Sequence, residues 1–255
     1  TPPPRAVRVA GAPVDPRVRA RWVAARRAEG RRRLRVLLVL VSVTVVVVLA
    51  WGVTLSPLLD VDHIVVKGTS HTTAGQVESA GGIHPGDPLA WLDTSGAVAR
   101  IEALPYVRTA RVQREWPDAV KISVTERVPV AWVEGGKRRA LVDGSGRVLE
   151  SVADPPVGMP QLAGMATVPD AGRSVAPVVG ARVAAALGSL AAGVRSITVT
   201  DAGVSLLLTS GPEVRLGDPT RVGVKVRAAA AVIAALKGTE LHYVDVSVPT
   251  NPVAG

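Results

Sequence analysis

The feature that most constrains this chain is an apolar run at 36–55, twenty residues without a charged side chain. An α-helix rises about 1.5 Å per residue, so a helix over this run matches a hydrocarbon core about 30 Å thick. No other stretch of the sequence is as long and as apolar. We therefore expect a single transmembrane helix at 36–55, with most of the chain beyond it.

The charge distribution indicates which end of the chain stays in the cytoplasm. Residues 1–35 hold 11 Arg and 2 acidic residues, a net charge of +9, whereas the remaining 220 residues hold 19 basic and 19 acidic residues. Arginines beside an apolar span are retained on the cytoplasmic side. A nucleic-acid-binding surface would instead interleave basic and aromatic residues over a folded domain. We therefore predict a largely disordered cytoplasmic tail at 1–35 and no nucleic-acid partner.

The apolar run is longer than the core of a cleaved signal peptide, which is usually about 7–15 residues. Trp51 stands at its outer end as an interfacial anchor, and the run leads into Ser56-Pro57 without a small-residue cleavage site. A retained anchor in the cell membrane is the better interpretation, with the C-terminal region extracytoplasmic. The chain has no cysteine, so disulfides and thiolate chemistry are absent.

The pattern after the apolar run predicts a small α+β unit of order β-α-α-β-β. Thr73 and Gln76 have the spacing of a capping box at a helix start, and Gly81-Gly82 would end that helix. Val120, Ile122 and Val124 alternate with polar residues, as in a half-buried strand. The expected strands are 61–66, 107–115 and 120–126, and the expected helices are 73–82 and 95–104.

The rest of the chain predicts a larger, β-rich domain with two helices. Residues 154–172 are rich in Pro and Gly and are expected to be irregular. Asp218 and Pro219 are expected to be the N-cap and first residue of the second helix. Leu241 to Val248 reads as the last strand, with Val244, Val246 and Val248 facing the core. The other expected elements are strands at 130–133, 139–142, 147–150, 194–200, 204–208 and 213–216, and a helix at 175–190.

No catalytic motif is found in the sequence. Neither a phosphate-binding loop nor a serine-hydrolase, penicillin-binding or zinc-protease signature is present. His63 and His71 could meet across a loop, but solvated surface histidines are the favoured interpretation. Asp143 and Ser145 are expected to form a hairpin turn. Glu134, Asp143, Glu150 and Asp154 could form a hydrolase pair, yet no aromatic sugar platform accompanies them. We predict no enzyme activity, cofactor, metal or small-molecule substrate.

Several motifs, in their order and spacing, resemble the bacterial division protein family FtsQ/DivIB. The resemblance spans residues 30 to 250, and its most specific part is the WPD turn together with E-R-x-P-x-A. The small unit looks like the POTRA domain of that family, and the β-rich part looks like its β domain. The matching segments are REWPD at 114–118, KISV at 121–124, ERVPVAW at 126–132, LVDGSG at 141–146, LGD at 216–218, Lys225 and YVDVSVP at 243–249.

The resemblance implies a non-enzymatic divisome scaffold, enriched at the division septum, that supports septal peptidoglycan synthesis. Its expected partners are FtsB- and FtsL-like bitopic division proteins and other divisome components. The expected domains are a POTRA domain at 56–128, a β domain at 129–250 and a C-terminal tail at 251–255. In the family, the last β-domain strands receive a segment of FtsB, and the POTRA unit is linked to recruitment.

Two surfaces follow from that resemblance. A terminal strand can pair with an incoming extended segment if its side is free. The expected partner-binding residues are Tyr243, Val244, Asp245, Val246 and Ser247, and Tyr243 is the expected anchor because interface energy concentrates in aromatic residues. A Tyr that packs on the neighbouring strand is the alternative.

The expected recruitment surface is Val112 and Arg114. The alternative is a core valine beside a solvated arginine. Two other classes of protein compete with the scaffold. A membrane-anchored cell-wall enzyme, or its regulatory subunit, would need an acid/base pair or a metal in the β domain. A POTRA-bearing transport component would need repeated units or a barrel, and neither pattern is present.

Overall fold

The computed structural model of the chain describes residues 33–49, 51–52, 59–236 and 241–255. It divides into two compact units, Thr1–Leu59 and Asp60–Gly255. In the first unit, residues 33–49 are helical, so the helix begins inside the predicted tail. Within the described ranges, no helix combines the length and apolarity that a membrane crossing requires. The predicted span at 36–55 lies partly outside the described residues, as does nearly all of the tail at 1–35.

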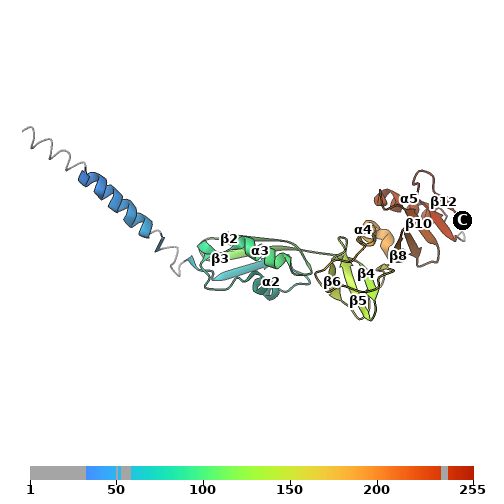
Figure 1. Ribbon diagram of the computed structural model, residues 1–255, viewed down its shortest axis with the longest axis horizontal. Helices are drawn as coiled ribbons and strands as arrows, with labels where there is room; N and C mark the ends of the chain where they lie inside the picture. Colours follow the sequence, from blue (N-terminus) through green and yellow to red (C-terminus); the bar gives the residue numbers. More distant parts are fainter. Residues whose placement is uncertain (1–32, 50, 53–58, 237–240) are drawn as a thin grey trace, which may run out of the picture. The chain divides into compact units, whose positions relative to one another are not determined.

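The second unit begins with a small domain whose three strands carry two helices on one face (Figure 1). The strand order is β1-β3-β2, with β1 parallel and β2 antiparallel to the central β3. This is the predicted β-α-α-β-β order. The elements are β1 (His63–Lys67), α2 (Ala74–Gly81), the 3-10 turn η2 (Leu89–Trp91), α3 (Thr94–Glu102), β2 (Val107–Glu115) and β3 (Ala119–Glu126).

The local signals that predicted this first domain are confirmed. Thr73 caps α2 through the Gln76 N–H, and the Gln76 side chain accepts from the Thr73 N–H. Gly82 ends the helix in the left-handed conformation with φ of 61°. The side of β3 that carries Val120, Ile122 and Val124 is buried against the helices, and the two layers share one core. That core consists of Val61, Val77, Ile83, Leu89, Ala97, Ile101, Val107, Val120, Ile122 and Val124.

The second domain is built on one nine-stranded sheet of order β12-β11-β10-β9-β8-β7-β4-β5-β6 (Figure 1). Helix α4 packs against β4 and β8, and α5 packs against β10 and β11. The elements are β4 (Pro129–Gly135), β5 (Arg138–Asp143), β6 (Val148–Ser151), β7 (Gln161–Leu162), α4 (Val179–Ala186), the 3-10 turn η3 (Gly188–Gly193), β8 (Val194–Thr200), β9 (Gly203–Leu208), β10 (Glu213–Gly217), α5 (Val222–Ala235), β11 (Tyr243–Asp245) and β12 (Val253–Ala254).

Three expectations about this domain were wrong. The predicted irregular stretch 154–172 contains β7, which joins β4 to β8 by parallel pairing. The predicted helix 175–190 is shorter, because α4 covers only eight residues and η3 follows. Helix α5 begins at Val222 rather than at Pro219, because the Asp218 carboxylate accepts from the Thr220 N–H and closes a turn before the helix.

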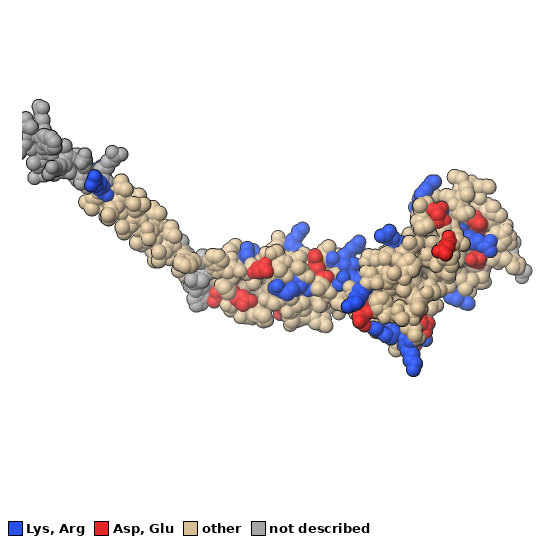
Figure 2. Space-filling model, viewed as in Figure 1, with Lys and Arg blue, Asp and Glu red and all other residues tan. Residues whose placement is uncertain are grey.

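On the face of 60–255 that Figure 2 shows, basic and acidic side chains are interspersed. The helix at 33–49 differs, because it is uncharged beyond its N-terminal end (Figure 2). Its leucines and valines are exposed, from 49% at Val45 to 64% at Leu49.

Candidate partner-binding surfaces

Strand β11 holds three of the five predicted partner-binding residues. It runs from Tyr243 to Asp245, not over 241–248, and it pairs in parallel with β10. Val244 and Val246 are fully buried, as the alternation predicted, and the Val246 N–H bonds the Arg215 carbonyl. Val248 is 57% exposed, so its predicted core position was wrong. The strand ends early because the chain turns, with the Asn251 N–H bonded to the Val248 carbonyl.

The open side of β11 is covered by β12, a two-residue strand within the segment expected to be a tail. Val244 and Asp245 pair with Ala254 and Val253. Tyr243 and Gly255 exchange N–H···O bonds of 2.9 and 3.1 Å. Hydrogen-bonding direction alternates along an antiparallel strand, so the N–H and C=O of Ala254 point away from β11.

The outer side of β12 offers little to pair with in the described chain. Ala254 presents one N–H and one C=O there, and Pro252, the next position that would face outward, has no N–H. On β11, by contrast, Tyr243 and Asp245 direct their backbone groups toward β12. The residues that alternate with them, Val244 and Val246, direct theirs toward β10. The larger potential pairing surface therefore lies on β11, under β12.

The predicted anchor Tyr243 is half-buried and packs on a neighbouring strand. The guanidinium of Arg215, on β10, lies 5.0 Å from the centre of its ring. The contact is of the kind that the alternative interpretation, a packed Tyr, describes, while the anchor role of Tyr243 stays a prediction, and Arg215 was missed. Its position on β10 was predicted, but the register that places it beside Tyr243 depends on parallel pairing of distant segments.

Asp245 and Ser247, the other two predicted partner-binding residues, form a local turn. The Asp245 carboxylate accepts from the Ser247 N–H at 2.8 Å. Hydrogen bonds from the Ser247 hydroxyl and N–H lower the pKa of Asp245 below its ordinary value. Asp245 is therefore ionised at neutral pH and holds the backbone just beyond β11.

A buried lysine supports β10 and α5 beside this edge. Lys225 is 2% exposed, and its Nζ donates to the Asp218 carbonyl and carboxylate, each at 2.9 Å. Hydrogen bonds from Thr220 and Lys225 hold the pKa of Asp218 far below its ordinary value. Both residues belong to the motifs noted in the sequence. Their pairing was not predicted, because Asp218 was expected to cap the helix.

Strand β2 is an edge of the first sheet, and it carries the predicted recruitment residues Val112 and Arg114. The Ala110 N–H bonds the Glu102 carboxylate at 2.9 Å rather than β3, so Ala110 faces the open side. By alternation, the N–H and C=O of Val112 and Arg114 also point to that side. Glu102 thus blocks the edge at Ala110 and leaves it available at 112–114.

The side chains of these two residues point toward the helices. Val112 is half-buried against the core, and the Arg114 guanidinium donates to the Leu92 carbonyl at 2.6 Å. The alternative of a core valine beside a solvated arginine does not describe the pair fully, since Arg114 is bonded and Val112 lies at the margin of the core, and the recruitment role stays a prediction. What this segment offers outward is mainly backbone.

The segment that joins the two domains is held by a salt bridge. Arg127 Nη1 lies 2.7 Å from Asp143 Oδ2, and both side chains are largely buried. The other Asp143 oxygen accepts from the Ser145 and Arg147 N–H groups, which confirms the predicted turn. Burial opposes ionisation of Asp143, but the bonds from Ser145, Arg127 and Arg147 outweigh it and lower the pKa. This Asp–Ser pair is a structural turn.

The other candidate carboxylates are engaged with neighbours. Glu134 and Asp154 lie within 3.3 and 3.7 Å of Arg139. Glu150 accepts from the Tyr106 hydroxyl at 2.6 Å. Among the described residues, no group of three or more His, Asp or Glu is arranged to hold a metal ion.

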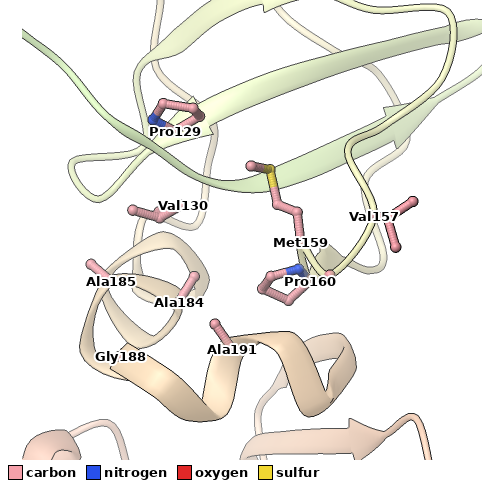
Figure 3. Close-up of a pocket in the computed structure, with 10 residues that line it drawn as sticks. Pro129, Val130, Val157, Met159, Pro160, Ala184, Ala185, Gly188 and Ala191 are labelled. Carbon is pink, nitrogen blue, oxygen red and sulfur yellow. The ribbon is translucent and has the colours of Figure 1, made fainter.

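A pocket of about 310 Å³ lies between β4, the 157–160 segment and the α4–η3 region (Figure 3). The Trp132 indole N–H bonds the Met159 carbonyl and fixes one wall. The lining carries no titratable or nucleophilic side chain, so it provides no acid, base or nucleophile for catalysis. The lining residues are Pro129, Val130, Val157, Gly158, Met159, Pro160, Ala184, Ala185, Gly188 and Ala191.

Comparison with known families matches both domains. Residues 59–127 match the model of the FtsQ-type POTRA domain, and residues 130–247 match that of the C-terminal region of the cell division protein FtsQ/DivIB.

Curated relatives agree with these matches. The chain is 32% identical over 250 residues to the cell division protein FtsQ of Streptomyces collinus, which covers 92% of this chain and 91% of the relative. It is 32% identical over 212 residues to the protein of the same name from Streptomyces venezuelae, with coverage of 80% and 77%. For the Streptomyces griseus protein the identity is 34% over 211 residues, with coverage of 77% and 97%.

Proposed function

The chain belongs to the FtsQ/DivIB family of cell division proteins, and from this premise we propose that it is a non-enzymatic scaffold of the divisome. It recruits and binds membrane-anchored division proteins of the FtsB and FtsL type and supports septal peptidoglycan synthesis. A single span at 36–55 holds it in the cell membrane, the tail at 1–35 is cytoplasmic, and the POTRA domain at 56–128 and β domain at 129–250 lie outside.

The proposed anchor is supported by the first unit. Beyond Arg35 its helix at 33–49 is mainly exposed aliphatic side chains, and Thr44, one of its few polar residues, donates its hydroxyl to the Leu40 carbonyl. A hydroxyl satisfied within the helix and an aliphatic surface are what a lipid environment requires. The arginines before the helix favour retention of that end in the cytoplasm.

The observation that carries the scaffold proposal is the sheet edge at β11. A partner segment in extended conformation pairs with the backbone of Tyr243 and Asp245 after it displaces β12. The two residues of β12 pair with β11 and Gly255 bonds Tyr243 and His242, so the cover that the partner replaces is three residues long. Tyr243, Asp245 and Ser247 then border the partner, while buried Val244 and Val246 keep β11 attached to the core.

The POTRA domain uses its own edge for recruitment. The outward N–H and C=O groups of Val112 and Arg114 provide a short platform for a second partner segment. Glu102 limits this platform at Ala110, and thereby sets the register of an added strand.

The β-domain mechanism is tested by a matched pair of substitutions at Asp245. Asp245→Pro removes the N–H that faces the partner but leaves the β10 ladder, so we expect partner capture from membranes to fall about tenfold or more. Asp245→Ala retains that N–H and should reduce capture far less. Tyr243→Ala should also weaken capture. Unchanged co-purification with both Asp245→Pro and Tyr243→Ala would refute strand addition at β11.

The cellular role is tested by localisation. A fluorescent fusion of the full chain should gather at the division septum, and even labelling of the membrane throughout division would contradict a divisome role. For the enzyme alternative, the same purified chain is incubated with peptidoglycan. Turnover of peptidoglycan by both the unchanged chain and Asp245→Pro would identify the chain as a cell-wall enzyme instead of a scaffold.

A further inference from the structure

Two tryptophans are exposed at the end of the POTRA domain where the chain enters it. Trp91 is 61% exposed and Trp116 is 57% exposed. In the described part of this domain, between residues 60 and 126, the only other strongly exposed large apolar residue is Val65. The chain contains five Trp, two Tyr and no Phe, so two exposed indoles in one small domain are a concentrated feature.

Both tryptophans lie on segments that are bonded to the entering chain. Asp60 bridges to Pro88, directly before η2, which carries Trp91. The Asp62 and His63 N–H groups both bond the carbonyl of Asp118, in the turn that carries Trp116.

A third contact closes this end of the domain. The Arg114 guanidinium on the Leu92 carbonyl connects the end of β2 to the segment after η2. The entry is thus bordered on one side by Trp91 and on the other by Trp116. We call this end of the domain, residues 60–63, 86–92 and 116–118, the entry face.

The entry face is tied closely to the apolar run. Seven peptide units separate residue 52, in the first unit, from residue 59, and a fully extended chain of that length spans at most about 25 Å. If the run at 36–55 crosses the bilayer, as the proposed function holds, residue 59, next to the entry face, cannot lie farther than that from the membrane surface. The entry face is the part of the extracytoplasmic region that the covalent chain keeps nearest to lipid.

We propose that the entry face docks on the bilayer, with Trp91 and Trp116 inserted among the lipid headgroups. The indole ring is amphipathic and concentrates at membrane–water interfaces. Docking fixes which way the POTRA domain stands on the membrane and thereby orients the β2 edge, which ends just before Trp116, toward neighbouring membrane proteins.

The charges at this end indicate what kind of lipid contact is made. The entry face holds Asp60, Asp62, Asp87 and Asp118 but no Lys or Arg, and the nearest guanidinium is that of Arg114 beside it, so acidic groups outnumber permanent cations. Attraction to anionic headgroups therefore does not drive the contact. Insertion of the two indoles does, and docking is expected to occur on zwitterionic lipid and to persist at high salt.

The experiment uses the full chain in phosphatidylcholine liposomes. Because the chain has no cysteine, Trp91→Cys, Trp116→Cys and, as a matched control on the β domain, Val157→Cys each carry one nitroxide label. Val157 is fully exposed and distant in sequence from the entry face. We expect the ratio of oxygen to nickel-chelate accessibility at 91 and 116 to exceed that at 157 about threefold, because oxygen partitions into lipid.

Labels at 91 and 116 that are as accessible to the nickel chelate as the label at 157 would overturn the proposal. Labels that are aqueous in liposomes but protected in native membranes would also overturn it and assign the entry face to a protein partner. Failure of the chain to stay in liposomes after alkaline extraction would refute the proposed anchor itself, which separates the two failures.

A second measurement does not depend on labelling and uses native side chains. Lipids brominated near the headgroup should quench part of the tryptophan fluorescence of the reconstituted chain. Trp91→Tyr with Trp116→Tyr should lower the quenched fraction, whereas Trp132→Tyr should raise it, because the Trp132 indole is half-buried and bonded to Met159. An equal quenched fraction in all three proteins would contradict docking.

Discussion

The edge strand β2 of the POTRA domain is nine residues long and has an open side, whereas β11 of the β domain is a three-residue strand covered by β12. The first edge presents Val112 and Arg114 directly, and Glu102 limits it at one end. The second must lose β12 before Tyr243 and Asp245 can pair with another chain. An open edge favours fast, reversible contacts, while a covered edge exchanges one strand for another and so discriminates between partners.

The two edges are also supported differently from behind. In the β domain, buried Lys225 bonds Asp218 at the end of β10. In the POTRA domain, the Glu126 carboxylate at the end of β3 accepts from the His71 and Thr72 N–H groups, and so holds the loop before α2. One support is an ion pair and the other is a set of backbone hydrogen bonds. Each support can be removed by a substitution that leaves every residue of β11 and β2 unchanged.

The largest expected effect is at Lys225. Lys225→Ala should lower the free energy of unfolding of the β domain by about 3 kcal/mol, because it removes a buried ion pair and leaves a cavity. The value lies at the low end for such pairs because the Asp218 side chain is 59% exposed. Denaturant unfolding of the full chain, followed through Trp132 fluorescence, measures it.

The control for this prediction is Lys225→Met, which fills the space and should cost less. Septal recruitment through the POTRA edge should survive in both variants, because β2 belongs to a separate core. Equal stability of Lys225→Ala and the unchanged chain would show that the β11 edge does not depend on this pair.

The next effect is expected at the open edge. Arg114→Pro removes an outward N–H and should lower the ratio of septal to lateral fluorescence several-fold, because a partner strand loses its hydrogen bond. Arg114→Ala keeps that N–H and loses only the bond to the Leu92 carbonyl, so its effect should be small. If Arg114→Ala were as damaging as Arg114→Pro, the side chain rather than the backbone would be the recruiting group.

The two domains also show how much of the fold the sequence could predict. The alternation of β3 and the capping box at Thr73 are local patterns, and both were found where predicted. Strands β7 and β12 have two residues each, and only pairing with strands distant in sequence defines them. Asp218 was expected to cap the helix, but it bonds Lys225 and Thr220 instead. That arrangement likewise depends on three-dimensional contacts.

A smaller effect is expected from acid at Glu126. Burial opposes its ionisation, but the His71, Thr72 and Ser70 N–H groups outweigh burial and lower its pKa to about 2, from an ordinary 4.5. The unfolded chain therefore binds this proton first as the pH falls. The stabilisation is complete above about pH 4.5 and is lost between about pH 4.5 and pH 2.

Glu126→Gln should therefore destabilise the POTRA domain by about 1–2 kcal/mol at pH 7 and remove this acid dependence. Urea unfolding, followed through the methyl NMR signals of buried Val77, measures it at pH 7 and at pH 3. A variant whose stability falls between these pH values as steeply as that of the unchanged chain would show that Glu126 is not the group responsible.

The smallest effect is expected at the covering strand, and it decides how the covered edge works. The Ala254 N–H points away from β11, so Ala254→Pro leaves the β11–β12 pairing intact and blocks only addition to the outside of β12. If partners displace β12, capture should stay within about twofold of the unchanged chain, since Asp245 keeps its N–H. A loss as large as that of Asp245→Pro would place the partner outside β12. Both edges would then be open platforms, and the difference between the two domains would lie in length alone.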